Sequence, residues 1–132
     1  MSEDVFDPSS PWDDLVGFTI DRLEPGICVA HAELGEPHQQ AYGIVHGGVW
    51  ASLVESAASV AAAVTAGTQV VGVSNSTDFL RSHRDGRVDV VAEPVHTGRR
   101  QALWEVRITR ASDGKLVARG QVRFQVMDEA VR

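Results

Sequence analysis

Residues 46–67 read HGGVWASLVESAASVAAAVTAG, and this stretch decides which fold the chain can adopt. It begins with a glycine pair, continues as a long run of Ala, Val and Leu, and ends at another glycine. Such punctuation predicts a helix that opens at Gly47-Gly48, reaches about Thr65 and stops near Gly67. The helix is apolar on most sides but interrupted by serines and one glutamate. This pattern indicates a helix buried in a protein core rather than one that spans a membrane.

Segments rich in β-branched and aromatic residues lie on both sides of this helix. Two precede it, at 18–23 and 27–34, and the Pro25-Gly26 turn signal between them predicts a hairpin. Four follow it, separated by Asp-Gly or Thr-Gly turns, at 70–81, 87–96, 102–110 and 116–127. The order β-β-α-β-β-β-β predicts an α+β fold, in which a largely antiparallel sheet packs against one helix.

Length, composition and charge limit the class of protein. The chain has 132 residues, 43% apolar and 23% charged, which suits one soluble domain. We expect a lead-in at 1–13 and a single domain at 14–132. A net charge of −6 argues against nucleic-acid binding. The N-terminus lacks the pattern of a signal peptide and Cys28 is the only cysteine, so we expect a cytoplasmic protein with Cys28 in its core.

Glu55 is the only residue from Pro37 to Thr77 that carries a full charge at neutral pH. On the predicted helix it would be buried, and an unpaired buried carboxylate is costly, so it needs either a structural partner or a chemical role. At the helical period four polar residues fall within an arc of roughly 100°: Ser52, Glu55, Ser56 and Ser59. The structural alternative is a glutamate that bonds backbone groups or bridges an oligomer interface.

His46-Gly47-Gly48 adds a second chemical feature at the start of the helix. The first N–H groups of a helix lack intrahelical acceptors and carry the positive end of its dipole, so they can hold a carbonyl oxygen that becomes negative during attack. Gly47 and Glu55 are about 12 Å apart along one helix, too far to act on one carbonyl. We therefore predict an active site shared between two chains, with Gly47 of one facing Glu55 of the other.

The spacing Gln40-(five residues)-His46-Gly47-Gly48-(six residues)-Glu55-(three residues)-Ser59 resembles the active-site pattern of hotdog-fold acyl-CoA thioesterases. The resemblance covers residues 14–127. It is to the branch with the phenylacetate-pathway, Arthrobacter-type 4-hydroxybenzoyl-CoA and 1,4-dihydroxy-2-naphthoyl-CoA thioesterases. This family wraps its sheet around one central helix, which agrees with the order of elements predicted above.

The resemblance implies a role for each matching residue. Gly47 would polarise the thioester carbonyl through its backbone N–H, and Gln40 would bond or orient the same carbonyl. His46 would hold the loop or contact the thioester, although it could simply cap the helix. Glu55 would act as nucleophile or as general base on water, and Ser59 would orient the water or the carboxylate.

The resemblance also implies partners and ligands. The substrate would be an acyl-CoA with an aromatic or medium-length acyl group, and the protein would be a homodimer, commonly paired into a tetramer. Two loops would contact the nucleotide and phosphates of CoA, through Ser82, Arg84 and Gly86 and through His96, Gly98 and Arg99. The basic residues in these segments could receive a polyphosphate, or they could be solvated loop residues.

Other classes of function are disfavoured. His31, His38 and His83 have no metal-ligand spacing, so we expect no metal and no cofactor apart from the CoA of the substrate. Trp50 is expected in the core or at an interface, with the wall of the acyl pocket as the alternative, and Trp104 is expected in the core. Two alternatives stay open: a hotdog hydratase or dehydratase acting on acyl thioesters, and a non-catalytic acyl-CoA sensor.

Overall fold

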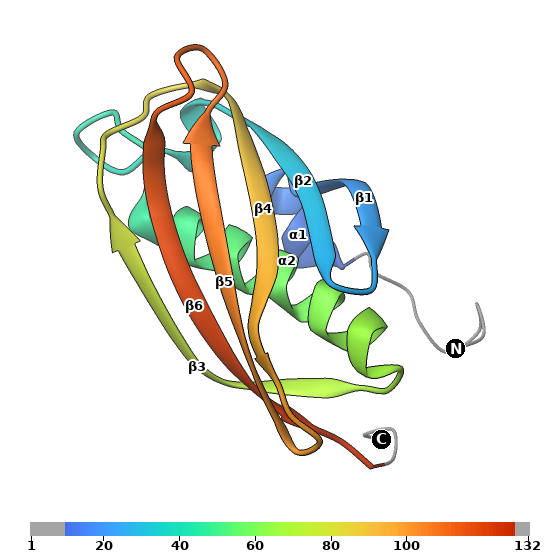
Figure 1. Ribbon diagram of the computed structural model, residues 1–132. Coiled ribbons are helices and arrows are strands. Elements are labelled where there is room, and N and C mark those ends of the chain that lie inside the picture. The colour runs from blue at the N-terminus through green and yellow to red at the C-terminus, as the bar shows by residue number, and fades with distance from the viewer. Residues whose placement is uncertain (1–9, 129–132) are drawn as a thin grey trace.

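The computed structural model describes residues 10–128, which form a curved six-stranded antiparallel sheet and one long helix lying across its concave face (Figure 1). The strand order in the sheet is β1-β2-β4-β5-β6-β3. The elements along the chain are α1 (Pro11–Val16), β1 (Thr19–Glu24), β2 (Ile27–Leu34), the 3-10 turn η1 (Glu36–His38), α2 (Gly47–Ala66), β3 (Val70–Phe79), β4 (Gly86–Thr97), β5 (Gln101–Arg110) and β6 (Leu116–Val126). The predicted α+β arrangement is confirmed.

Helix α2 begins and ends at the residues that the glycines predict. His46 is its N-cap, and Gly67 ends it in the left-handed conformation with φ 71°. The helix is long and apolar enough to cross a membrane by length and composition alone. However, ten of its side chains are buried against the sheet or α1, including Trp50 and Leu53. The apolar run is therefore accounted for by the core of the domain.

The hairpin of β1 and β2 supplies one end of this core. The two strands pair antiparallel around a turn in which Gly26 has φ 92°. Alternate residues of β2 point inward and are buried, as the pattern predicts: Cys28, Ala30, Ala32 and Leu34. Burial, with a smaller contribution from Asp21, raises the pKa of the Cys28 thiol to about 11. Cys28 is thus a core residue with a protonated thiol at neutral pH.

Helix α1 packs on the outer side of α2. Ser10 caps it, and Trp12 Nε1 donates a hydrogen bond to Ser52 Oγ at 2.9 Å. The Ser56 hydroxyl donates to the carboxylate of Asp13, which is only 8% exposed. Residues 11–13, which the sequence suggested as part of a lead-in, therefore contact the main helix. Residues 1–9 of that lead-in lie outside the described residues.

Strand β3 forms one edge of the sheet and ends two residues earlier than predicted. Beyond Phe79 the N–H groups of Leu80 and Arg81 both donate to the carbonyl of Val117, so the regular ladder stops there. Most of β3 is exposed, and Val71 and Val73 are among its exposed apolar side chains. The chain then turns through 80–85 into β4, beside the loop that leads into α2 (Figure 1).

Candidate active site

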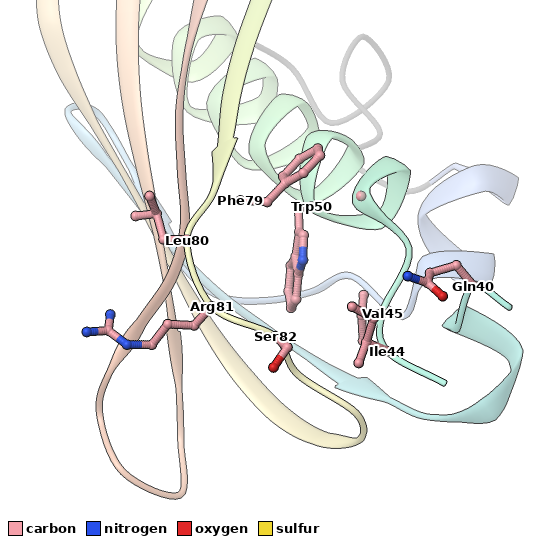
Figure 2. A pocket seen from close by; sticks show the side chains of 9 residues that line it. Gln40, Ile44, Val45, Trp50, Phe79, Leu80, Arg81 and Ser82 are labelled. Atoms are coloured by element: carbon pink, nitrogen blue, oxygen red, sulfur yellow. The ribbon is translucent and has the colours of Figure 1, made fainter. Parts of the chain in front are cut away.

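A cavity of about 290 Å³ lies where the loop before α2 meets the end of β3 (Figure 2). Its polar groups include the side chain of Gln40 and the backbone of Gly47, and its walls are largely apolar. The lining residues are Gln40, Ile44, Val45, Gly47, Trp50, Phe79, Leu80, Arg81 and Ser82. The structure therefore brings together Gln40, Gly47 and Ser82, three of the predicted site residues.

Gln40 is oriented by its own loop. Its amide oxygen accepts a hydrogen bond from the N–H of Tyr42, and its backbone N–H donates to the carbonyl of Ile44 at 2.8 Å. Within residues 10–128 the side-chain nitrogen of Gln40 makes no hydrogen bond, so its N–H groups can donate to a ligand. Figure 2 shows this nitrogen turned toward the cavity. Such a donor could bond a carbonyl oxygen bound there.

His46 caps helix α2. Its Nδ1 accepts a hydrogen bond from the N–H of Gly48 at 2.8 Å, so the ring carries its proton on Nε2 when neutral. This is the capping alternative considered for His46, and it holds the loop against the helix. The N–H of Gly47 has no acceptor within residues 10–128. The cap therefore satisfies the second donor of the helix and leaves the first one available beside the cavity.

Glu55 is exposed in the single chain, and the expectation that it is buried was wrong. The apolar side chains of α2 pack against the sheet, whereas Glu55 lies on an exposed side of the helix next to strand β3. Asn75 Nδ2, on β3, donates to the Ala51 carbonyl at 3.0 Å and to Glu55 Oε1 at 3.5 Å. A carboxylate held at the surface by one amide is well placed to meet a second molecule.

The polar stripe of α2 divides into two parts. Ser52 and Ser56 bond to residues of α1, so they have structural roles. Ser59 is half-buried and lies one turn after Glu55 on the same helix. Because α2 is continuous, Gly47 and Glu55 of one chain are separated by about 12 Å along the helix axis. One chain therefore does not bring the helix N-terminus and the carboxylate together.

The two groups of predicted CoA-binding residues lie at opposite ends of the sheet. Ser82 lines the cavity, Arg84 Nη1 is 3.5 Å from the carbonyl of Gly43, and Gly86 begins β4 with φ 97°. The second group sits at the other end of β4, next to the C-terminal turn of α2 (Figure 1). Its members are His96, Gly98 and Arg99. A single chain cannot place both groups on one nucleotide, since β4 spans twelve residues between them.

The arginines of these segments differ in their ion pairing. Arg87 is 2.9 Å from Asp89 and 3.8 Å from Asp21, so carboxylates already neutralise it. Within the part of the chain that the structure describes, Arg84 and Arg99 form no ion pair with a carboxylate. These two are thus the more suitable cations for a phosphate group.

Two residues near the site, Asn75 and Phe79, were given no role from the sequence. Asn75 bonds Glu55, and Phe79 packs against Gly47 with its ring at the cavity. Trp50 is 2% exposed, which confirms its place in the core, and it also lines the cavity, which was the alternative considered for it. The polar run of 74–77 inside a predicted strand was the only sequence signal for Asn75. Nothing in the sequence placed Phe79 against a residue far away along the chain.

Comparison with known proteins identifies the family of the chain. The sequence pattern of the thioesterase superfamily matches residues 42–117. A proposed esterase of Mycobacterium tuberculosis is 44% identical over 89% of this chain and 87% of its own length. Its solved structure has a TM-score of 0.88 and 43% identity, covering 93% of this chain and 100% of the solved one. The chain belongs to the thioesterase superfamily and has its hotdog fold.

Two further similarities define the class more closely. The 1,4-dihydroxy-2-naphthoyl-CoA hydrolase of Escherichia coli is 42% identical over 72% of this chain and 74% of its own length. The phenylacetic acid degradation protein PaaI of Thermus thermophilus, solved as a point mutant, has 28% identity and a TM-score of 0.83. That comparison covers 89% of this chain and 100% of PaaI. By class, the protein is a thioester hydrolase of the PaaI-like type.

Proposed function

We propose that this protein hydrolyses an acyl-CoA thioester to free CoA and a carboxylic acid, with an aromatic or medium-length acyl group. The observation that carries the proposal is the pair of donors at the cavity, the Gly47 N–H and the Gln40 amide nitrogen. Apolar walls from Trp50, Phe79 and Leu80 suit an acyl group. The name of the E. coli relative supports an aromatic acyl-CoA as substrate.

In the proposed mechanism, the two donors hold the thioester carbonyl oxygen and stabilise the negative charge that develops on it. Glu55 of the partner subunit either takes a proton from the attacking water or attacks the carbonyl itself. Ser59 orients the water or the carboxylate. When Glu55 acts as the base, collapse of the tetrahedral intermediate breaks the C–S bond, and the CoA thiolate takes up the proton that Glu55 removed from water. When Glu55 attacks the carbonyl, collapse leaves an anhydride between Glu55 and the acyl group; water then hydrolyses it to the free acid and the Glu55 carboxylate, and the proton released goes to the CoA thiolate. His46 keeps the helix N-terminus in place through its bond to Gly48.

A dimer is part of the proposal because one chain separates Gly47 from Glu55. Among the described residues, 10–128, no strand pairs with the outer edge of β3, and Val71 and Val73 on this strand are exposed. An open apolar edge of this kind favours association with a second strand. Asn75 holds Glu55 near the same edge through a hydrogen bond, so the Glu55 carboxylate would face a second copy of the chain that docked there. Further pairing of dimers would let different subunits supply the two CoA-binding groups.

The proposed reaction requires water and the thioester alone. We therefore propose no metal and no cofactor apart from the CoA of the substrate. Separately, we propose that the protein is cytoplasmic. Arg84 and Arg99, which are free of carboxylate partners in the described residues, are the proposed phosphate contacts. Ser82, Gly86, His96 and Gly98 are proposed to contact CoA beside them.

Thiol release from a panel of aromatic and alkyl acyl-CoA esters tests the proposal. We expect turnover by the wild-type protein and a loss of about two to four orders of magnitude in kcat for Glu55→Gln. Glu33→Gln, which changes an exposed carboxylate on β2, is the matched control and should be fully active. Hydration of crotonyl-CoA without thiol release would favour the hydratase alternative. Tight binding of CoA esters without turnover would favour the sensor.

A further inference from the structure

Gly47 packs directly against the aromatic ring of Phe79. A Cβ atom built at residue 47 would lie 2.4 Å from Cε2 and 2.7 Å from Cζ of that ring. The backbone at residue 47 is helical, and Gly47 is not among the glycines with positive φ. Local conformation therefore does not require glycine here. The ring of Phe79 fills the space that a side chain would occupy.

Phe79 is placed to influence the cavity as well as the helix. It is the last residue of β3, and its ring is 59% exposed in the chain. The ring lines the same cavity as Gln40 and Trp50, and Figure 2 shows it beside the first turns of α2. An exposed aromatic ring thus covers the residue whose N–H has no acceptor within residues 10–128.

We propose that Phe79 is a positioning residue for thioester hydrolysis and acts through Gly47. The ring closes one side of the helix N-terminus, so water has less access to the Gly47 N–H and a carbonyl can approach from the cavity side alone. A fixed donor in a water-poor site stabilises developing charge more than a solvated donor does. This inference rests on the proposed function and assigns a reason for glycine at residue 47.

Substitution of Phe79 gives the first test. Phe79→Ala should lower kcat by about tenfold to a hundredfold with little change in KM, because the donor is worth most in the transition state. Phe79→Leu, which restores apolar bulk, should recover most of the loss. Leu15→Ala is the control: Leu15 is 69% exposed on α1 and has no role in the site, so kcat should be unchanged. Unfolding midpoints and native masses are measured for every variant.

A double-mutant cycle with Gly47→Ala gives the second test. A methyl group at residue 47 must displace the ring, so Gly47→Ala and Phe79→Ala remove the same contact. We expect the double variant to be no slower than the slower single variant, as holds for changes that act on one shared interaction. If glycine were needed for substrate to approach instead, the two losses in kcat would multiply.

The outcomes separate this inference from the proposed function. Three results would overturn the role of Phe79 without affecting the proposal of hydrolysis. The first is a wild-type kcat in Phe79→Ala, and the second is an equal loss of kcat in Phe79→Ala and Phe79→Leu. The third is a double variant whose loss of kcat is the product of the two single losses. A loss in Phe79→Ala that merely follows dissociation into single chains would also overturn it. No thiol release by the wild-type protein from any ester would overturn both.

Discussion

Asn75 and Glu55 are joined by a hydrogen bond between strand β3 and helix α2, with Asn75 Nδ2 donating to Glu55 Oε1 at 3.5 Å. The same nitrogen donates to the Ala51 carbonyl at 3.0 Å, and Thr77 Oγ1 donates to Asn75 Oδ1 at 2.7 Å. This chain of contacts fixes the Asn75 amide, and the amide in turn orients the carboxylate. The proposed catalytic group therefore depends on the edge strand as well as on its own helix.

Asn75→Ala should reduce kcat by about tenfold with little effect on folding, because Glu55 keeps its charge but loses its orienting donor. Ser74→Ala, one residue away on the same exposed strand, is the control and should keep full activity. Steady-state thiol release and thermal unfolding are measured for both variants. If Asn75→Ala has the same kcat as wild type, the hydrogen bond from Asn75 to Glu55 does not contribute to catalysis.

Ser56→Ala should destabilise the fold by about 1–3 kcal/mol, since it removes the hydroxyl that donates to the buried Asp13 carboxylate. Asp14→Ala changes the exposed neighbour of Asp13 and should leave stability nearly unchanged. Urea unfolding gives both values. If the two variants unfold at the same urea concentration as wild type, the attachment of α1 through Ser56 is energetically unimportant.

Gly120→Ala should cost about 1–3 kcal/mol through overpacking in the core. A Cβ there would lie 2.8 Å from Val54 Cγ1 and 3.0 Å from the backbone oxygen of Ser76, which cannot move without shifting β3. Gly72→Ala is the matched control, because its nearest neighbour would be a Phe124 ring carbon at 3.8 Å. Chemical denaturation of both variants checks this, and a Gly120→Ala protein as stable as Gly72→Ala would contradict the packing described.

Cys28 should make unfolding easier at alkaline pH. Burial raises the pKa of its thiol from 9.0 to about 11. Below pH 9 the thiol is protonated in both states, and its contribution to stability is complete. Between pH 9 and 11 the thiol ionises in the unfolded chain but stays protonated in the folded one, so stability falls as pH rises. Cys28→Ala should therefore lose less unfolding free energy between pH 8 and 10.5 than wild type; an equal loss would show that the thiol is not protected.

Local patterns were enough to predict most of the fold. Glycines at 47–48 and 67 mark the two ends of α2, and the alternation of apolar residues in β2 places Cys28 in the core. Both features could be predicted because each depends on residues that are close in sequence. The surroundings of Glu55 could not be predicted in the same way. A single charge in a long uncharged stretch gives the same sequence pattern whether it is buried in its own chain or exposed toward a partner.

Contacts between distant segments also escaped prediction. Trp12 with Ser52 and Phe79 with Gly47 are pairs that only the folded sheet and helix bring together. The capping role of His46 became clear only from the structure, in which its Nδ1 accepts a hydrogen bond from the N–H of Gly48. Side-chain polarity identified the candidate site, but the direction in which each donor points required the structure.

The shared site is tested most directly by mixing two inactive chains, Gln40→Ala and Glu55→Gln. Each alone should lose about a hundredfold or more in kcat, since one removes a carbonyl donor and the other the carboxylate. After unfolding and refolding together in equal amounts, half of the dimers should contain one chain of each kind. One of their two sites is then intact, so we predict about a quarter of wild-type activity. Activity no higher than the average of the two parents would contradict a site built from Gly47 of one chain and Glu55 of its partner.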